Sequence, residues 1–212
     1  MKIRRICMCL GGVMLGAISV GAFKIAALGV DPFQSLMSGL DKLIPIPFGT
    51  LYVLINLLLL TFSLVVDRSK IGLATFINLF LLGYVTEFSY GVFQTLLPEP
   101  DMVTRVICLL CGTVVMCFGS ALYITADLGV STYDAVAIAL AGKWKIAPFQ
   151  YCRIGSDLVC VIAGSLIFLA GGGAVRDIPT IAGVGTIIAA FFMGPLIEFF
   201  NRKVARPMLA QQ

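Results

Sequence analysis

The chain of 212 residues contains no histidine, and only 12% of its residues are charged. Without an imidazole it lacks the usual ligand of a catalytic zinc ion and the general base of a Ser-His-Asp triad. It also lacks the Gly-Lys-Ser/Thr sequence of a phosphate-binding loop. The sequence therefore predicts no enzyme activity, no metal site and no cofactor.

The scarcity of charge also excludes an ordinary soluble domain. Hydrophobic residues make up 59% of the chain, whereas soluble proteins are about 45–50% apolar and about 25% charged. A net charge of +4 could indicate a nucleic-acid partner, but the basic residues flank apolar runs, as they do at membrane surfaces. We therefore expect a polytopic membrane protein with the lipid bilayer as its partner and no nucleic acid.

The apolar runs predict the secondary structure. A helix needs about 20 residues to cross a hydrocarbon core of about 30 Å. Six runs approach or exceed this length: 6–26, 51–66, 71–97, 106–126, 150–170 and 178–200. Two shorter segments, 31–46 and 131–146, are interrupted by polar residues or bounded by prolines. The predicted fold is all-α, with six long transmembrane helices and two short broken or re-entrant helices, or alternatively with eight crossings.

One motif occurs twice, about 100 residues apart. Ala27-Leu28-Gly29-Val30-Asp31-Pro32-Phe33 follows the first long run, and Asp127-Leu128-Gly129-Val130-Ser131-Thr132-Tyr133 follows the fourth. The two halves also end alike: Gly72, Thr75, Phe80, Gly83, Glu87 and Phe88 match Gly183, Thr186, Phe191, Gly194, Glu198 and Phe199 in spacing. We therefore predict two tandem repeats of about 100 residues, a pattern common in transporters.

This duplication defines the predicted domains. They are a first membrane repeat at 1–98, a linker at 99–105, a second membrane repeat at 106–201 and a cytoplasmic tail at 202–212. The N-terminus has the basic and apolar regions of a signal peptide. Because the equivalent run 106–126 is internal, we expect the first run to remain in the bilayer as an anchor.

Several of these motifs resemble those of the YczE/YitT group of bacterial integral membrane proteins. The resemblance rests on the two Leu-Gly-Val segments, Arg153-x-x-x-Asp157, and Gly183-x-Gly185-Thr186 with Gly194-Pro195. It covers nearly the whole chain, although the second segment has Ser131-Thr132-Tyr133-Asp134 where a Pro-Arg-Asp-type run is expected. The resemblance implies a multi-pass protein of the bacterial inner membrane with internal repeats. It implies little about chemistry.

Positive charge does not decide between six and eight crossings. Both topologies place the same number of Lys and Arg residues on the cytoplasmic side, and both place the two termini there. Three crossings per half would relate the halves as an inverted repeat, and four as a parallel one. The short, interrupted segments 31–46 and 131–146 favour six.

Charged residues at membrane depth are the candidates for a site, because each costs about 2.5–3.5 kcal/mol to insert. The substrate-binding candidates are Asp31, Asp127, Asp134, Arg153 and Asp157. Arg153 and Asp157 are spaced for a local ion pair, but the guanidinium could instead hold an anionic group. Asp31 and Asp134 are either helix caps or ligand contacts.

Glu87 and Glu198 occupy matching positions near the ends of their spans. Each could be an interfacial carboxylate that reaches water, or a proton carrier in a partly dry cavity. With these candidates, the sequence predicts a small-solute transporter or permease with a site between the repeats. The alternative is a non-transporting scaffold or accessory subunit of a partner protein.

The small residues of Gly12-x-x-x-Gly16 form a face that allows another helix to approach closely. This face could pair two copies of the chain in a homodimer, contact a partner membrane protein, or pack within the chain.

Overall fold

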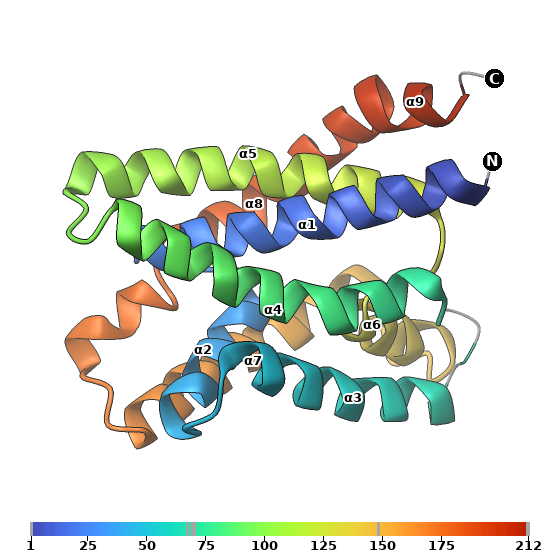
Figure 1. Ribbon diagram of the computed structural model, residues 1–212. Coiled ribbons are helices and arrows are strands. Elements are labelled where there is room, and N and C mark those ends of the chain that lie inside the picture. The colour runs from blue at the N-terminus through green and yellow to red at the C-terminus, as the bar shows by residue number, and fades with distance from the viewer. Residues whose placement is uncertain (1, 67, 69–70, 148, 211–212) are drawn as a thin grey trace.

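The computed structural model describes residues 2–66, 68, 71–147 and 149–210, which form helices and no strands (Figure 1). The α-helices are α1 (Lys2–Ala26), α2 (Pro32–Leu43), α3 (Phe48–Val66), α4 (Leu73–Leu96), α5 (Met102–Ala126), α6 (Thr132–Gly142), α7 (Phe149–Ala170), α8 (Val184–Phe200) and α9 (Arg206–Ala210). A 3-10 helix, η2 (Val175–Thr180), precedes α8, and a π-helical turn, η3 (Asn201–Ala205), follows it. The predicted all-α class is confirmed.

Helix length agrees with a membrane protein. By length and composition, five helices among the described residues can cross a bilayer. Two helical segments, Val175–Ala189 and Phe191–Ala210, are bent by 50° relative to each other, and the number is six if they form one span. Helices α2 and α6 have only 12 and 11 residues, or about 18 Å at 1.5 Å per residue. Each is too short to cross the bilayer alone.

The long helix α1 lies at the centre of the bundle, and α5 packs along it. They lie side by side and run in opposite directions, and the two chain termini lie at one end of the molecule (Figure 1). The helices approach most closely at two glycines, where a Cβ on Gly12 would lie 2.5 Å from the carbonyl oxygen of Gly119. The Gly12 face therefore packs within the chain.

The two Leu-Gly-Val segments have the same backbone conformation. Ala27 and Asp127 have φ angles of 50° and 51°, and Gly29 and Gly129 have φ angles of 102° and 116°. Positive φ is strained for most residues, whereas Gly adopts it freely and Asp tolerates it. Each segment thus ends a long helix and turns the chain into a short one.

Each of these segments also contacts the helix that closes the other half of the chain. The hydroxyl of Thr186, on α8, donates to the carbonyl oxygen of Val30 at 2.7 Å. In the same way, the hydroxyl of Thr75, on α4, donates to the carbonyl oxygen of Val130 at 2.6 Å. The two halves are therefore interlocked.

Some helix boundaries differ from those expected. Helix α5 begins at Met102, inside the segment 99–105, because Asp101 caps it. The hydrogen bond from the Thr104 hydroxyl also lowers the pKa of Asp101. Helix α8 begins at Val184 rather than Ile178, because the chain is extended at Gly183. Within 202–212, the described residues continue as η3 and α9.

Candidate functional site

The two short helices meet at their N-termini near the middle of the bundle. Asp31 caps α2 by accepting a hydrogen bond from the backbone N–H of Gln34 at 3.2 Å, and the Ser131 hydroxyl accepts one from the N–H of Asp134 at 3.1 Å. In the first turns that follow, the rings of Phe33 and Tyr133 stack with their centroids 4.9 Å apart. The cap predicted at Asp134 is therefore wrong: Ser131 caps α6, and Asp134 lies in the first turn. The two caps bring Asp31 and Asp134 to the same region.

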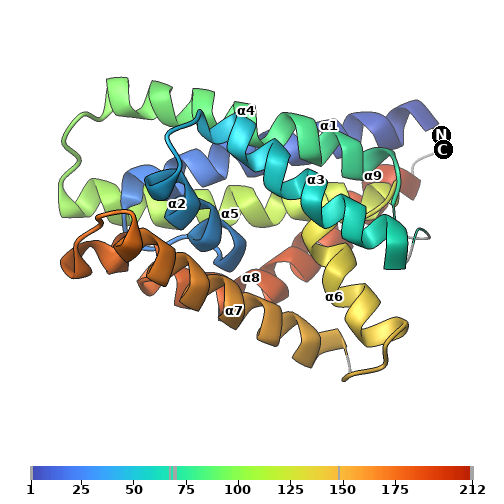
Figure 2. The same cartoon turned by 90° about the horizontal axis from the view of Figure 1, so that it is seen from below.

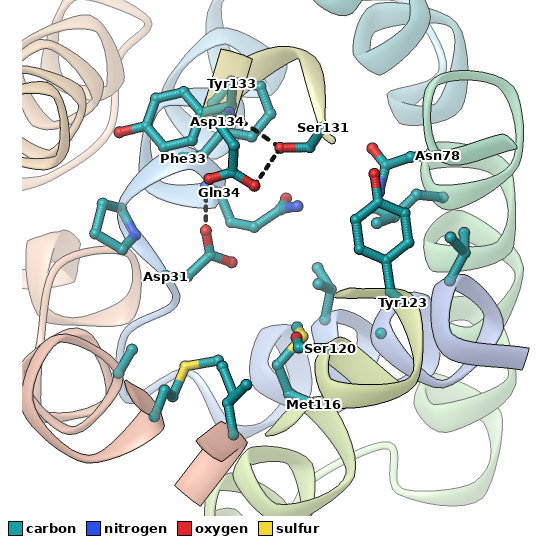
Figure 3. Close-up of a pocket in the computed structure, with 18 of the residues that line it drawn as sticks. Asp31, Phe33, Gln34, Asn78, Met116, Ser120, Tyr123, Ser131, Tyr133 and Asp134 are labelled. Carbon is teal, nitrogen blue, oxygen red and sulfur yellow. Dashed lines mark hydrogen bonds between the residues drawn. The ribbon is translucent and has the colours of Figure 1, made fainter. Parts of the chain in front are cut away.

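A cavity of about 440 Å³ opens beside these helix ends (Figure 3). Its lining comes from both halves of the chain, with residues of α1 to α8 or of the turns that precede α2 and α6. This volume lies within the range of about 300–1,000 Å³ that is typical of small-molecule sites. Four of the predicted site residues line it: Asp31, Asp134, Arg153 and Asp157.

Arg153 is the centre of an ion-pair cluster at the cavity wall. Its guanidinium contacts the carboxylate of Asp134, and its Nε lies 3.3 Å from Oδ1 of Asp157. The same Oδ1 accepts a hydrogen bond of 2.7 Å from the hydroxyl of Tyr133, whose ring lies 4.5 Å from the guanidinium carbon. The spacing of Arg153 and Asp157 thus yields the local ion pair, and the guanidinium is already matched by two carboxylates.

Asp31 differs from the other two carboxylates of the cavity. Within the described part of the chain, no Lys or Arg nitrogen forms an ion pair with it within 4.0 Å. In Figure 3 its side chain lies at the edge of the cavity, next to Gln34. Asp31 therefore caps α2, and no cationic side chain of the described residues forms an ion pair with its carboxylate.

Two polar atoms in the cavity wall were not predicted. The side-chain oxygen of Gln34 and the hydroxyl of Tyr123 are both buried and have no hydrogen-bond partner among the described residues. The Gln34 side chain is only 4% exposed and extends into the cavity (Figure 3). A buried polar group without a partner costs about 1–3 kcal/mol, so these atoms suit a bound molecule or water. Gln34 could have been found in the sequence as an uncharged polar residue in the first turn of the helix that follows Asp31.

A set of hydrogen bonds holds the other side of the cavity in place. The Thr132 hydroxyl, on α6, donates to the side-chain oxygen of Asn56 on α3. One turn earlier on α3, the Tyr52 hydroxyl donates to Asn78 on α4 at 3.2 Å. Asn56 and Asn78 are conspicuous as amides within apolar runs, but only the tertiary structure assigns them partners.

Asp127 lies outside the central cavity. Its side chain is 85% exposed and 3.6 Å from the guanidinium of Arg5. It lines a second pocket, which shares Tyr123, Ile124 and Asp134 with the central cavity. The two pockets are therefore neighbours. Asp127 is the C-cap of α5, and this end of α5 lies at the end of the bundle where the chain termini lie (Figure 1).

Glu87 and Glu198 also lie away from the cavity. Glu87 accepts a hydrogen bond of 2.9 Å from the backbone N–H of Gly49. Glu198 lies 3.7 Å from Arg202, and its side chain is half exposed. Both interpretations of these residues, as interfacial carboxylates or as proton carriers, stay predictions.

The residue types that line the cavity do not suit a metal ion. Among the residues that the structure describes, no three His, Cys, Asp or Glu side chains are close enough to hold a metal ion. Cys108 and Cys111 have the spacing of a metal pair, but Cys108 is partly buried and Cys111 is exposed. The cavity instead combines carboxylates with aromatic rings and amides.

A model of a family of unknown function, DUF6198, matches residues 3–202. The chain belongs to this family. Two similar proteins are from Bacillus subtilis (strain 168): "Uncharacterized protein YyaS", 24% identical over 94% of both chains, and "Uncharacterized membrane protein YczE", 24% identical over 82% of this chain and 74% of the relative. An "Uncharacterized protein" of Haemophilus influenzae is 23% identical over 92% of this chain and 84% of its own. No solved structure matches significantly.

These relatives confirm the resemblance to YczE that the motifs indicated. Together with the long apolar helices, they identify the DUF6198 chain as a multi-pass integral membrane protein.

Proposed function

We propose that the protein is a small-solute transporter or permease and that the central cavity is its binding site. One observation carries the proposal: the cavity is lined by both halves of the chain and contains charged groups and two buried polar atoms without partners. Charge at membrane depth is costly, and so it is usually retained along the path of a substrate or an ion. A wall that served only for packing would be apolar.

The proposed architecture is an inverted repeat with six crossings. The similar φ angles at the Leu-Gly-Val segments and the matched contacts of Thr75 and Thr186 support duplication of the chain. The opposite directions of α1 and α5 support inversion (Figure 1). Short helices that meet at the centre of an inverted repeat are typical of transporter sites.

In this proposal the chain lies in the bacterial inner membrane with both termini in the cytoplasm. The second pocket, next to Asp127, is then the entry from the cytoplasmic side. Asp31, Asp134, Arg153 and Asp157 form the site itself, and no catalytic step is involved.

Uptake into proteoliposomes tests the proposal. Vesicles containing the purified full-length protein are incubated with a pool of small metabolites, and their contents are compared by mass spectrometry with those of empty vesicles. We expect at least one solute to accumulate, and the variant Ser120→Leu, which fills the cavity, to abolish its accumulation. The matched control Leu58→Phe adds volume on α3 at a side chain that is 67% exposed and should transport normally.

A protein that accumulates no solute of the pool under several ion gradients would contradict the transporter proposal. The scaffold or accessory subunit would then be the better hypothesis, and co-purification from native membranes would be the next measurement.

A further inference from the structure

We propose that the cavity binds a small organic monocation that carries N–H groups, such as a primary amine. This inference rests on the proposed function, because it names the class of solute for the same site. It follows from the charge of the cavity, from its free hydrogen-bond acceptors and from its aromatic lining.

The charges that face the cavity sum to a negative value. Asp31, Asp134 and Asp157 contribute three negative charges, and Arg153 contributes one positive charge. The N-termini of α2 and α6 each add about half a positive charge from the aligned peptide dipoles. About one negative charge remains, and a monocation would balance it.

About half of this remaining charge belongs to Asp31 at the α2 N-terminus, and about half to Asp134, Asp157 and Arg153 at the α6 N-terminus. Asp134 and Asp157 both pair with Arg153, whereas Asp31 has no ion-pair partner within 4.0 Å in the described chain. Binding of an anion would need a free guanidinium, and that of Arg153 is already engaged by two carboxylates. The electrostatics of the site therefore favour a cation beside Asp31.

The buried polar atoms indicate a ligand that donates hydrogen bonds. The Gln34 side-chain oxygen is an acceptor without a partner in the described residues, and Gln34 follows Asp31 in the first turn of α2. The Tyr123 hydroxyl, also without a partner, can accept or donate. An ammonium group has three N–H donors and no acceptor, so it matches Asp31 and Gln34 together.

The rest of the lining suits an organic body. The rings of Phe33, Tyr52 and Tyr133 form a contiguous aromatic wall, with the Phe33 centroid 6.0 Å from that of Tyr52 and 4.9 Å from that of Tyr133. Aromatic faces attract cations and also bury apolar groups. A bare metal ion would not use this wall, and the described residues offer it no cluster of three acidic, His or Cys ligands.

The test compares three probes of similar shape and different charge. The full-length protein in detergent is titrated with benzylammonium, benzyl alcohol or benzoate, and its thermal unfolding is followed. We expect benzylammonium alone to raise the melting temperature in a dose-dependent manner. Preferred binding of benzoate, equal binding of benzyl alcohol, or no binding of the ammonium probe would overturn the inference.

Two variants assign the site. Asp31→Asn keeps a good helix cap but removes the charge, and it should weaken binding of benzylammonium about tenfold or more. Gln34→Glu adds a carboxylate of nearly the same shape and should strengthen binding of benzylammonium. The test therefore includes an expected gain of binding as well as an expected loss. Asp177→Asn, at a half-exposed residue of η2 that lines neither pocket, is the control and should bind as the unmodified protein does. Unchanged binding in both Asp31→Asn and Gln34→Glu would overturn the assignment.

Uptake separates this inference from the proposed function. If proteoliposomes accumulate an anionic solute in a manner that Ser120→Leu abolishes, transport stands and the cation site is overturned. If benzylammonium binds at Asp31 but no solute is taken up, the cation site stands and transport is overturned.

Discussion

Arg153 contacts two carboxylates and the face of Tyr133 at the wall of the cavity. These contacts connect the first turn of α6 to the N-terminal part of α7. Because the side chains are only about one-third exposed, water screens the charges incompletely. The cluster therefore links these two helices, and its single cation offsets part of the charge of the two carboxylates.

Replacing Arg153 tests the energetic role of this cluster. Arg153→Met leaves Asp134 and Asp157 facing each other without a cation, and we expect it to destabilise the folded protein by about 1–3 kcal/mol, less than a fully buried pair because of partial exposure. Thermal unfolding in detergent, followed by size-exclusion chromatography, measures the change. Adding Asp157→Asn to Arg153→Met should restore part of the loss. No loss in the single variant would contradict the structural role.

Gly29 and Gly129 are the residues at which the sequence constrains the backbone most directly. A Cβ on Gly29 would lie 2.6 Å from the backbone nitrogen of Gly183, and one on Gly129 would lie 2.7 Å from that of Gly72. Both glycines also have positive φ. Their small size allows the two Leu-Gly-Val segments to contact α8 and α4.

Alanine at either glycine should therefore destabilise the protein by similar amounts. We expect Gly29→Ala and Gly129→Ala each to cost about 1–3 kcal/mol, from strain and overcrowding. Gly155→Ala on α7 is the matched control, because nothing lies within 4 Å of its Cβ position. It should be neutral or slightly stabilising, since Ala favours a helix over Gly. A large difference between Gly29→Ala and Gly129→Ala would argue against equivalent roles.

At the scale of elements, the crossing of α1 and α5 holds the two halves together. Gly12 and Gly119 allow the helix backbones to touch, and a Cβ on Gly119 would lie 2.8 Å from the carbonyl oxygen of Gly12. Close backbone contact of this kind drives the packing of membrane helices, because burial against lipid gives little hydrophobic gain. The crossing also positions the cavity, which is lined by Gly12 and Gly16 on one side.

Adjacent glycines on α1 provide an internal control for this crossing. Gly12→Leu should separate α1 from α5 and lower the melting temperature and the yield of monodisperse protein. Gly11→Leu, one residue earlier, places the same side chain where a Cβ meets nothing within 4 Å and should have little effect. Equal behaviour of the two variants would show that this contact does not limit stability.

For the whole molecule, the arrangement of helix ends favours six crossings. Helix α4 begins at the end of the bundle where both termini lie, and it ends at the opposite end, where α5 begins (Figure 1). When the bundle is viewed from below, α2 lies between α4 and α7, whereas α6 extends toward the edge of the bundle (Figure 2). With the termini in the cytoplasm, the connection between α4 and α5 is then outside.

Cysteine labelling from outside the cell distinguishes the topologies. In a variant without the seven native cysteines, Glu99→Cys should react with a membrane-impermeant maleimide and Ser69→Cys should react only after the membrane is permeabilised. Eight crossings predict the reverse for both positions, so each variant controls the other.

The amino-acid sequence by itself determined the membrane class, the long helices and the position of the two turns. These features are local: hydropathy and length select a spanning helix, while Gly29, Gly129 and the caps Asp31 and Ser131 set the turns between helices. Candidate site residues were found because charge at membrane depth is costly at any position. For the same reason Gln34, which carries no charge, was missed.

Only the tertiary structure decided which of these residues meet. Asp31, Asp134, Arg153 and Asp157 share one cavity, whereas Asp127 pairs with Arg5 outside it, although both Asp31 and Asp127 belong to Leu-Gly-Val segments. The difference arises from position: Asp31 precedes the inward end of α2, whereas Asp127 ends α5 at the side of the chain termini (Figure 1). Contacts between residues far apart in the chain, rather than local pattern, therefore decide which charges face the cavity. They also decide which of its polar atoms have no hydrogen-bond partner.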